Sequence, residues 1–181
     1  TGIDILGESD GSLPSRNWKK IEKHEDWYAG DTANLSIGQG YLLVTPLQIV
    51  RMIGCVANGG RLVTPHVLKR IGQAGEAAYR HTNLRFKKAN LDFVRDAMKA
   101  VVENDDGTGV FARSGTVSIS AKTGTSQVGP TLKTHAWLGG FAPSENPEIC
   151  FVVFLEHGGS GGDMPALIAK KAVEYWYEKK I

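Results

Sequence analysis

The 181-residue sequence predicts a fold of the α+β class, and three observations lead to this prediction. Three strand-like segments follow one another near the carboxyl end, at about residues 117–126, 135–141 and 148–156. No helical pattern interrupts them. Three stretches with apolar residues at helical spacing lie outside this block, at about residues 45–58, 90–105 and 164–179. Helices and strands that occupy separate stretches are typical of α+β proteins.

Residues 1–40 are rich in Gly, Asp, Ser and Trp and show little periodicity. We interpret them as a long loop that follows the surface and contains short helical pieces. Loops of this length in compact proteins are usually functional or rest on other structure.

The first long helix begins at Thr45 with Pro46 in its first turn, a position that suits proline. Its buried stripe is formed by Ile49, Ile53 and Val56, with Met52 beside it. Asn58-Gly59-Gly60 ends it, as a left-handed cap does. Residues 61–88 then predict a small region of strand and turn around Val63, Val67, Leu68 and Ile71.

The second helix begins near Asn90 and ends at Asp105-Asp106-Gly107. Its expected buried residues are Leu91, Val94, Ala97, Met98 and Val101. The third helix runs from about Met164 to Lys179. Its expected buried residues are Leu167, Ile168, Ala172, Tyr175 and Trp176.

Of the three strands, the last, Glu148 to Glu156, is nearly continuous in apolar residues, which predicts burial on both faces. The second runs from His135 to about Phe141 and is stopped by Pro143. The first alternates apolar and polar residues from Val117 onward, and this alternation leads into the stretch AKTGTS at residues 121–126.

The alternation places Lys122 and Gly124 on one face of the first strand, and Thr123 and Thr125 on the other. Glycine weakens a strand, and it often marks a place where another group approaches the backbone closely. A lysine next to a pair of hydroxyls is able to hold a carboxylate. The same tripeptide also fits an exposed polar strand end, so the pattern alone leaves both readings open.

Composition excludes several classes of function. Lys and Arg number 21 against 19 for Asp and Glu, a net charge of +2, and no basic run occurs, so nothing indicates a surface for nucleic acid. The longest apolar run, Ile149 to Leu155, is too short to cross a membrane. The five histidines are scattered, without metal-ligand spacing, so we expect no metal and no cofactor. Cys55 and Cys150 are expected to be buried free thiols.

A competing nucleophile is Ser160, because Gly158-Gly159-Ser160-Gly161-Gly162 matches the G-x-S-x-G elbow of α/β-hydrolases. It lies between a strand and a helix, as that motif requires. In that fold an acid and then a histidine follow the serine, but no histidine follows Ser160. A plain connecting loop is the favoured interpretation.

Several short motifs in a fixed order are more specific than either pattern alone. They are Thr1-Gly2-Ile3-Asp4, Gly30-Asp31-Thr32, Ser36-Ile37-Gly38-Gln39-Gly40, Thr45-Pro46-Leu47-Gln48, Asn58-Gly59-Gly60, Pro65-His66, Gly107-Thr108-Gly109, Lys122-Thr123-Gly124-Thr125 and Gly139-Gly140-Phe141-Ala142-Pro143. Together they resemble class B penicillin-binding proteins. The spacing of Trp18 and Trp27-Tyr28 is similar to that of the cell-elongation members, the penicillin-binding proteins 2. The resemblance covers essentially the whole chain.

The resemblance implies the penicillin-binding-protein and serine β-lactamase-like transpeptidase fold, a largely antiparallel sheet between helical layers. The family's signature also contains S-x-x-K and an S-x-N loop. No S-x-x-K occurs here, and the two S-x-N matches, Ser15-Arg16-Asn17 and Ser144-Glu145-Asn146, are expected to be coincidental. We therefore expect residues 1–181 to be the carboxyl-terminal part of a D,D-transpeptidase domain. Its serine nucleophile and S-x-N motif would lie in upstream sequence, with the membrane anchor.

The function that the resemblance implies is cross-linking of peptidoglycan stem peptides during elongation of the cell wall, through a serine acyl-enzyme. The implied catalytic residues are Lys122 and Thr125, and the implied substrate-binding residues are Thr123, Gly124 and Thr125. The backbone N–H of Thr125 would form half of an oxyanion hole. Gly124 would leave room for the helix that carries the serine. His135, Trp137 and Gln39 are weaker candidates for the rim of the cleft. Packing is the alternative for the first two, and capping of a turn is the alternative for Gln39.

The implied partners are a stem peptide ending in D-Ala-D-Ala, β-lactam antibiotics, the upstream remainder of the same protein, a membrane glycan-strand polymerase and cell-shape proteins. The implied location is the periplasmic face of the bacterial inner membrane, with an anchoring helix outside these residues. A non-catalytic penicilloyl sensor or degenerate relative is the alternative, which an altered upstream serine would favour.

Overall fold

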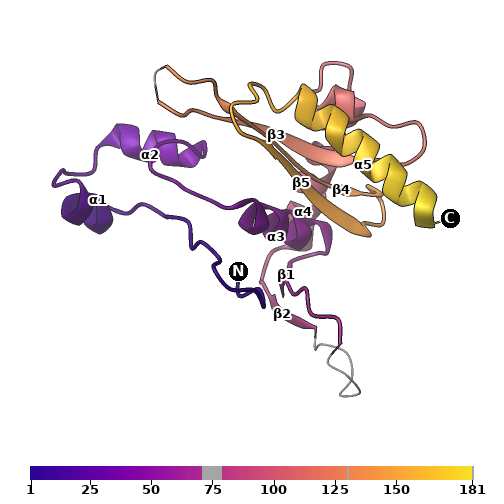
Figure 1. Ribbon diagram of the computed structural model, residues 1–181, viewed down its shortest axis with the longest axis horizontal. Helices are drawn as coiled ribbons and strands as arrows, with labels where there is room; N and C mark the ends of the chain where they lie inside the picture. Colours follow the sequence, from indigo (N-terminus) through magenta and orange to yellow (C-terminus); the bar gives the residue numbers. More distant parts are fainter. Residues whose placement is uncertain (71–78, 130, 181) are drawn as a thin grey trace. The chain divides into compact units, whose positions relative to one another are not determined.

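A computed structural model describes residues 1–70, 79–129 and 131–180 (Figure 1). The chain divides into two compact units. One unit comprises Thr1–Glu8 together with the described residues from Pro46 onward, and the other comprises Ser9–Thr45. The predicted candidate site around Lys122 belongs to the first unit.

The Ser9–Thr45 unit contains two short helices, α1 (Arg16–Glu22) and α2 (Ala29–Ser36). The Ser15 hydroxyl caps α1 by accepting a hydrogen bond from the backbone N–H of Trp18. Lys19 is only 3% exposed, and its ammonium group lies 2.8 Å from Asp31 and 4.8 Å from the ring centroid of Tyr28. A buried ammonium needs such partners. The prediction of a loop with short helical pieces is confirmed.

Helix α3 (Pro46–Ala57) confirms the first predicted helix, and Gly59 and Gly60 follow it with φ of 82° and 100°. Strands β1 (Arg61–Thr64) and β2 (Arg80–Asn83) then pair antiparallel. The predicted region of strand and turn is therefore confirmed, with Val63 in a strand and Val67 and Leu68 outside the strands. The backbone N–H groups of these two residues donate instead to the carboxylate of Asp4. Ile71 lies outside the described residues.

Helices α4 (Lys88–Glu103) and α5 (Met164–Lys180) confirm the other two predicted helices, but their buried stripes differ from the prediction. In α5 the buried residues are Pro165, Ala166, Ala169 and Val173, whereas Tyr175 is 63% exposed. In α4, Val94 is 41% exposed. Small residues bring α5 close to the sheet, so its larger apolar residues lie at the sides of the contact. The buried stripe predicted from the large apolar residues of α5 therefore lies on a different side of the helix from the buried stripe in the structure.

Strands β3 (Ser120–Ser126), β4 (His135–Ala142) and β5 (Ile149–Leu155) form an antiparallel sheet in that order. The alternation predicted the strand from Val117, but pairing begins at Ser120. Val117 and Ile119, which precede the first paired residue, are 6% and 0% exposed. The alternation of apolar and polar residues therefore reflects burial, and it begins before the strand pairing does. In the described part of the chain, β3 and β5 each pair only with β4.

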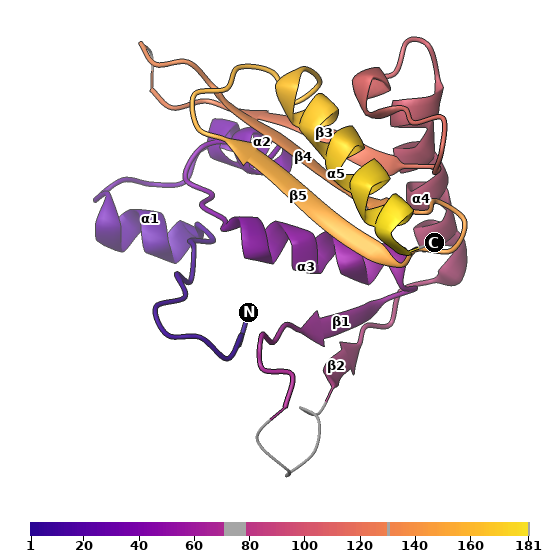
Figure 2. The same cartoon turned by 45° about the vertical axis from the view of Figure 1, so that its right-hand side comes forward.

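Helices cover both faces of this sheet (Figures 1 and 2). On one face Ala121, Leu138 and Ala142 pack with Ala166 and Val173 of α5. On the other face Phe141 packs with Ile53 of α3 and Met98 of α4. The predicted antiparallel sheet between helical layers is confirmed. Each residue of β5 stays partly exposed, so the predicted burial of this strand on both faces is only partial.

Candidate functional site

The register of the sheet fixes the two faces of the Lys-Thr-Gly-Thr stretch. Lys122 lies opposite Gly139 and Gly124 opposite Trp137, while Ala121 and Thr123 lie opposite Gly140 and Leu138. Ala121 packs on the α5 side, so the alternation of a strand places Thr123 and Thr125 on that side too. Lys122 and Gly124 lie on the side of α3 and α4. The predicted division of these residues between the faces is confirmed.

Lys122 is exposed on the edge strand. Its ammonium group donates to the backbone carbonyl of Thr123 at 2.7 Å and lies 3.4 Å from the Thr123 hydroxyl oxygen. Both contacts keep the charge beside the strand backbone. An anion that approaches the edge of β3 therefore meets a fixed positive charge next to two hydroxyl-bearing residues, Thr123 and Thr125.

The hydroxyl of Thr123 also contacts the hydroxyl of Thr108, with 2.9 Å between the two oxygens. Thr108 belongs to the Gly107-Thr108-Gly109 turn, which follows the end of α4 and precedes the short 3₁₀ helix Val110–Ala112. The sequence singled out this turn as part of the family resemblance, but no local pattern indicated that it reaches Thr123. Thr125 is exposed on the same strand.

Gly124 has a close neighbour other than the one expected from the sequence. A Cβ atom at this position would lie 3.3 Å from the Cβ of Trp137 on strand β4, closer than most such contacts. Among the described residues, the cross-strand tryptophan therefore limits the size of residue 124. The expected contact with a serine-bearing helix remains a prediction.

The glycine-rich loop between β5 and α5 packs against the same stretch. A Cβ at Gly161 would lie 2.1 Å from the carbonyl oxygen of Trp137 and 2.5 Å from that of Gly124. A Cβ at Gly162 would lie 2.3 Å from the carbonyl oxygen of Thr108. These distances leave no room for a side chain. The glycines allow the loop to contact the backbone of β3 and of the Thr108 turn.

The interpretation of Ser160 as a hydrolase nucleophile is wrong. The elbow motif belongs to folds of the α/β class, with a mostly parallel sheet, whereas β3, β4 and β5 are antiparallel. The Ser160 hydroxyl accepts a hydrogen bond from the backbone N–H of Gly162, 3.2 Å away, within its own loop. Close packing explains Gly158, Gly161 and Gly162, and the positive φ of 83° suits glycine at position 159.

His135 and Trp137, the two candidates on β4, lie on the Lys122 side of the sheet. Trp137 donates its indole N–H to the Ser126 hydroxyl at 3.1 Å, and its ring centroid is 4.3 Å from that of Phe154. His135 accepts a hydrogen bond from the backbone N–H of His157 and makes an edge contact with Phe154. Both side chains have packing roles, and their place at a cleft rim stays a prediction.

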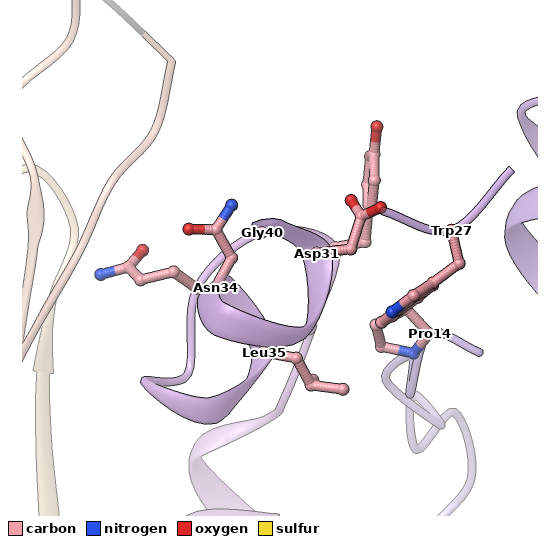
Figure 3. A pocket seen from close by; sticks show the side chains of 8 residues that line it. Pro14, Trp27, Asp31, Asn34, Leu35 and Gly40 are labelled. Carbon is pink, nitrogen blue, oxygen red and sulfur yellow. The ribbon is translucent and has the colours of Figure 1, made fainter. Parts of the chain in front are cut away.

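Gln39, the third rim candidate, belongs to the Ser9–Thr45 unit. There it lines a pocket of about 240 Å³. Figure 3 shows Trp27, Pro14 and Leu35 around this pocket, with Asp31 and Asn34 from α2. All residues that line this pocket belong to the Ser9–Thr45 unit. The assignment of Gln39 to the rim of a catalytic cleft therefore stays a prediction.

The second S-x-N match, Ser144-Glu145-Asn146, lies in the turn between β4 and β5, as expected for a coincidental match. Ser144 is 7% exposed and accepts a hydrogen bond from Ser120. Glu145 accepts hydrogen bonds from Lys99 of α4 at 2.5 Å and from the Ser118 hydroxyl at 2.6 Å. The turn therefore ties α4 to the start of β3.

We expect Glu145→Gln to lower the free energy of unfolding at pH 7 by up to about 1 kcal/mol, since the pair is largely exposed. The Lys99 and Ser118 hydrogen bonds lower the pKa of Glu145 from 4.5 to about 2. A lowered folded-state pKa stabilises the fold fully above about pH 5, and this contribution is lost as the pH falls toward 2. Urea unfolding at pH 7 and pH 3 should show a smaller difference at pH 3. A constant difference would contradict the assignment. Lys99→Met should reduce the same pH dependence without abolishing it, because the Ser118 hydrogen bond to Glu145 remains.

Two further observations concern the described residues, 1–70, 79–129 and 131–180. They contain no cluster of three or more His, Cys, Asp or Glu side chains arranged for a metal. None of their helices has the length and apolar character needed to cross a bilayer. Cys55 and Cys150 are free thiols, Cys55 buried and Cys150 partly buried, and burial raises the pKa of both.

Comparison with known proteins identifies the class to which this antiparallel sheet between helices, with its Lys-Thr-Gly-Thr edge strand, belongs. The sequence model of the penicillin-binding protein transpeptidase domain matches residues 1–174. The chain belongs to this family. The predicted family and fold are both confirmed.

The most informative relatives come from cell-wall synthesis. Peptidoglycan D,D-transpeptidase MrdA of Salmonella typhimurium is 34% identical over 98% of this chain. The crystal structure of Pseudomonas aeruginosa PBP2 in complex with WCK 5153 superposes with a TM-score of 0.83, at 37% identity, over 96% of this chain and 39% of that one. Helicobacter pylori PBP2, in a complex with MreC, gives a TM-score of 0.83 at 30% identity, over 99% of this chain and 34% of that one. The chain spans about a third of the length of the curated relative, 32%.

Proposed function

We propose that this chain is the carboxyl-terminal part of the catalytic domain of a peptidoglycan D,D-transpeptidase, which cross-links stem peptides during elongation of the cell wall. The observation that carries this proposal is the edge strand β3, where Lys122 and the hydroxyls of Thr123 and Thr125 line one short stretch. An extended peptide is able to add to such an edge, backbone to backbone. The similarity to MrdA over 98% of the chain supports the same reaction.

In this proposal the residues of β3 bind the D-Ala-D-Ala end of a stem peptide. Thr123 and Thr125 donate hydrogen bonds to the terminal carboxylate, and charge-assisted bonds of this kind are shorter and stronger than neutral ones. Lys122 supplies positive charge beside them. The backbone N–H of Thr125 stabilises the oxyanion that forms at the scissile carbonyl, a contribution of about 3–4 kcal/mol to the barrier.

The serine that forms the acyl-enzyme would lie outside residues 1–181. No serine of this sequence has a lysine three residues later, the spacing of the S-x-x-K motif. The serine attacks the peptide carbonyl and D-Ala leaves, and an amine from a neighbouring stem peptide then takes the acyl group. β-Lactams would acylate the same serine, since they imitate the D-Ala-D-Ala end.

Partners and location extend the same proposal. The Helicobacter pylori relative forms a complex with MreC, which supports binding of a protein of that kind by the intact protein. A membrane glycan-strand polymerase is a second expected partner. Both would act at the periplasmic face of the inner membrane, where an anchor outside residues 1–181 would hold the protein.

Labelling with a fluorescent penicillin tests the location of the nucleophile. The protein that contains residues 1–181 together with its upstream sequence should be labelled covalently at one serine, whereas the 181-residue chain alone should stay unlabelled. Gel fluorescence and peptide mapping would measure both. Stoichiometric labelling of the isolated chain would contradict the proposal. Labelling of the longer protein without cross-linking of stem peptides would instead favour the penicilloyl sensor.

A further inference from the structure

The contact between Thr108 and Thr123 joins two segments that are not neighbours in sequence. Thr108 is exposed and lies in the turn after α4, and Thr123 is half-buried on β3. Their hydroxyl oxygens are 2.9 Å apart, a normal hydrogen-bond distance. The proposed function assigns the Thr123 hydroxyl to the ligand's carboxylate and gives no role to Thr108.

Glycines on both sides fix the backbone of Thr108 against the end of α4. A Cβ at Gly107 would lie 2.3 Å from the carbonyl oxygen of Val101, and one at Gly109 would lie 3.1 Å from the Val101 side chain. The backbone N–H of Gly109 donates to that same carbonyl oxygen at 2.9 Å. The turn is therefore folded tightly back onto the last turns of the helix.

A third glycine holds Thr108 from another direction. Gly162, in the loop before α5, approaches the Thr108 carbonyl oxygen so closely that a Cβ there would lie 2.3 Å from it. Thr108 therefore lies between the end of α4 and this loop, and its hydroxyl reaches β3. A side chain on so constrained a backbone is suited to hold another group in one orientation.

The direction in which the Thr123 hydroxyl donates its proton depends on its neighbours. A hydroxyl has one proton to donate and two lone pairs that accept. The Lys122 ammonium, which carries only donors, lies 3.4 Å from the Thr123 oxygen and occupies one accepting direction. If Thr123 donated to Thr108, its proton would be unavailable to a carboxylate. If Thr108 donates, both lone pairs of Thr123 are engaged and its proton points elsewhere.

We propose that Thr108 is a positioning residue: it donates its hydroxyl proton to Thr123 and so directs the Thr123 proton to the carboxylate of the ligand. This inference rests on the proposed function. Thr108 acts through Thr123 and touches no reacting atom. The effect of Thr108 should therefore depend on the ligand's negative charge, because a hydrogen bond from an oriented hydroxyl is stronger to a carboxylate than to a neutral group.

The test compares two ligands in the intact, serine-containing protein: a penicillin with its free carboxylate, and the methyl ester of the same penicillin. Thr108→Val keeps the shape of the side chain and removes its hydroxyl. It should slow acylation by the free acid roughly tenfold and acylation by the ester less than about threefold, since hydrogen bonds to charged groups are the stronger ones. Thr108→Ser, which keeps the hydroxyl, should restore the rate with the free acid. Stopped-flow or gel-based acylation rates would measure each.

Two controls separate this role from a structural one. Thr116→Val removes a hydroxyl from an exposed turn, where Thr116 contacts only Ser114 among the bonds that the structure shows, and should leave both rates unchanged. In a protein that already carries Thr123→Val, adding Thr108→Val should have little further effect, because coupled residues are not additive.

Several outcomes would overturn the inference. One is an equal loss with acid and ester after Thr108→Val, and another is an unchanged rate with the acid. Full additivity with Thr123→Val would also contradict it. A failure of the proposed function is distinct from these. The unsubstituted protein would then either resist acylation by both ligands, in which case the inference would fall with it, or be acylated without cross-linking stem peptides.

Discussion

Replacement of Lys122 by alanine in the intact protein is expected to slow acylation by penicillin by about 10²–10³-fold, the range for loss of one electrostatic group at such a site. The melting temperature should change by less than about 2 °C, because less than about 0.5 kcal/mol of stability is at stake for an exposed side chain. Lys122 is exposed, and among the described residues its ammonium group contacts the carbonyl and hydroxyl oxygens of the adjacent Thr123. Removal of its side chain should therefore change the stability of the fold little and weaken the binding of an anion strongly.

Acylation kinetics and a thermal melt on the same preparation would check this expectation. Lys171→Ala is the matched control, since it removes an exposed lysine from α5 on the opposite side of the sheet. The control should change neither quantity. If Lys122→Ala stayed within about threefold of the unsubstituted rate, well below the roughly 1.4 kcal/mol of a tenfold change, the lysine would be an ordinary polar strand end.

Gly161→Ala is expected to lower the free energy of unfolding by about 3 kcal/mol, the upper part of the range for overpacking. The added methyl group would lie 2.1 Å from the carbonyl oxygen of Trp137 and 2.5 Å from that of Gly124. Both are backbone atoms of paired strands, so a side-chain rotation cannot relieve the contact. The loop or β3 must move, and acylation by penicillin should fall together with stability.

Denaturant unfolding and the acylation rate would measure the two effects. Gly115→Ala is the control, because a Cβ there meets no atom within 4 Å and the residue does not require positive φ. It should be nearly neutral. An unchanged stability for Gly161→Ala would mean that the loop before α5 is not packed on β3. A loss of stability without slower acylation would mean that Gly124 does not depend on that packing.

The sequence predicted the elements of the fold well, because their signals are local. Pro46 and the glycines after α3 mark the two ends of that helix, and alternation marks β3. The sides of the helices were harder to predict. The face of α5 that contacts the sheet carries Ala166, Ala169 and Val173, and a search for large apolar residues does not find such a stripe.

The candidate site shows the same division. Alternation alone placed Lys122 and Thr123 on opposite faces, and the structure confirms it. The Thr108 contact and the Gly161 approach join segments far apart in the chain, which no local pattern encodes. The reason offered for Gly124 was incomplete for the same cause, since its cross-strand neighbour Trp137 follows only from the register.

The Ser9–Thr45 unit interrupts the sequence of the other unit, which ends its first segment at Glu8 and resumes at Pro46. Two backbone hydrogen bonds between Ser12 and Leu43, at 2.8 and 2.9 Å, hold the two ends of this unit together. Its helices are held by contacts of its own, such as that between Lys19 and Asp31. In terms of chain topology it is an insertion between Glu8 and Pro46 of the other unit. Lengthening a closed loop costs little free energy, so residues inserted at an exposed position of this unit should leave the register of the sheet unchanged.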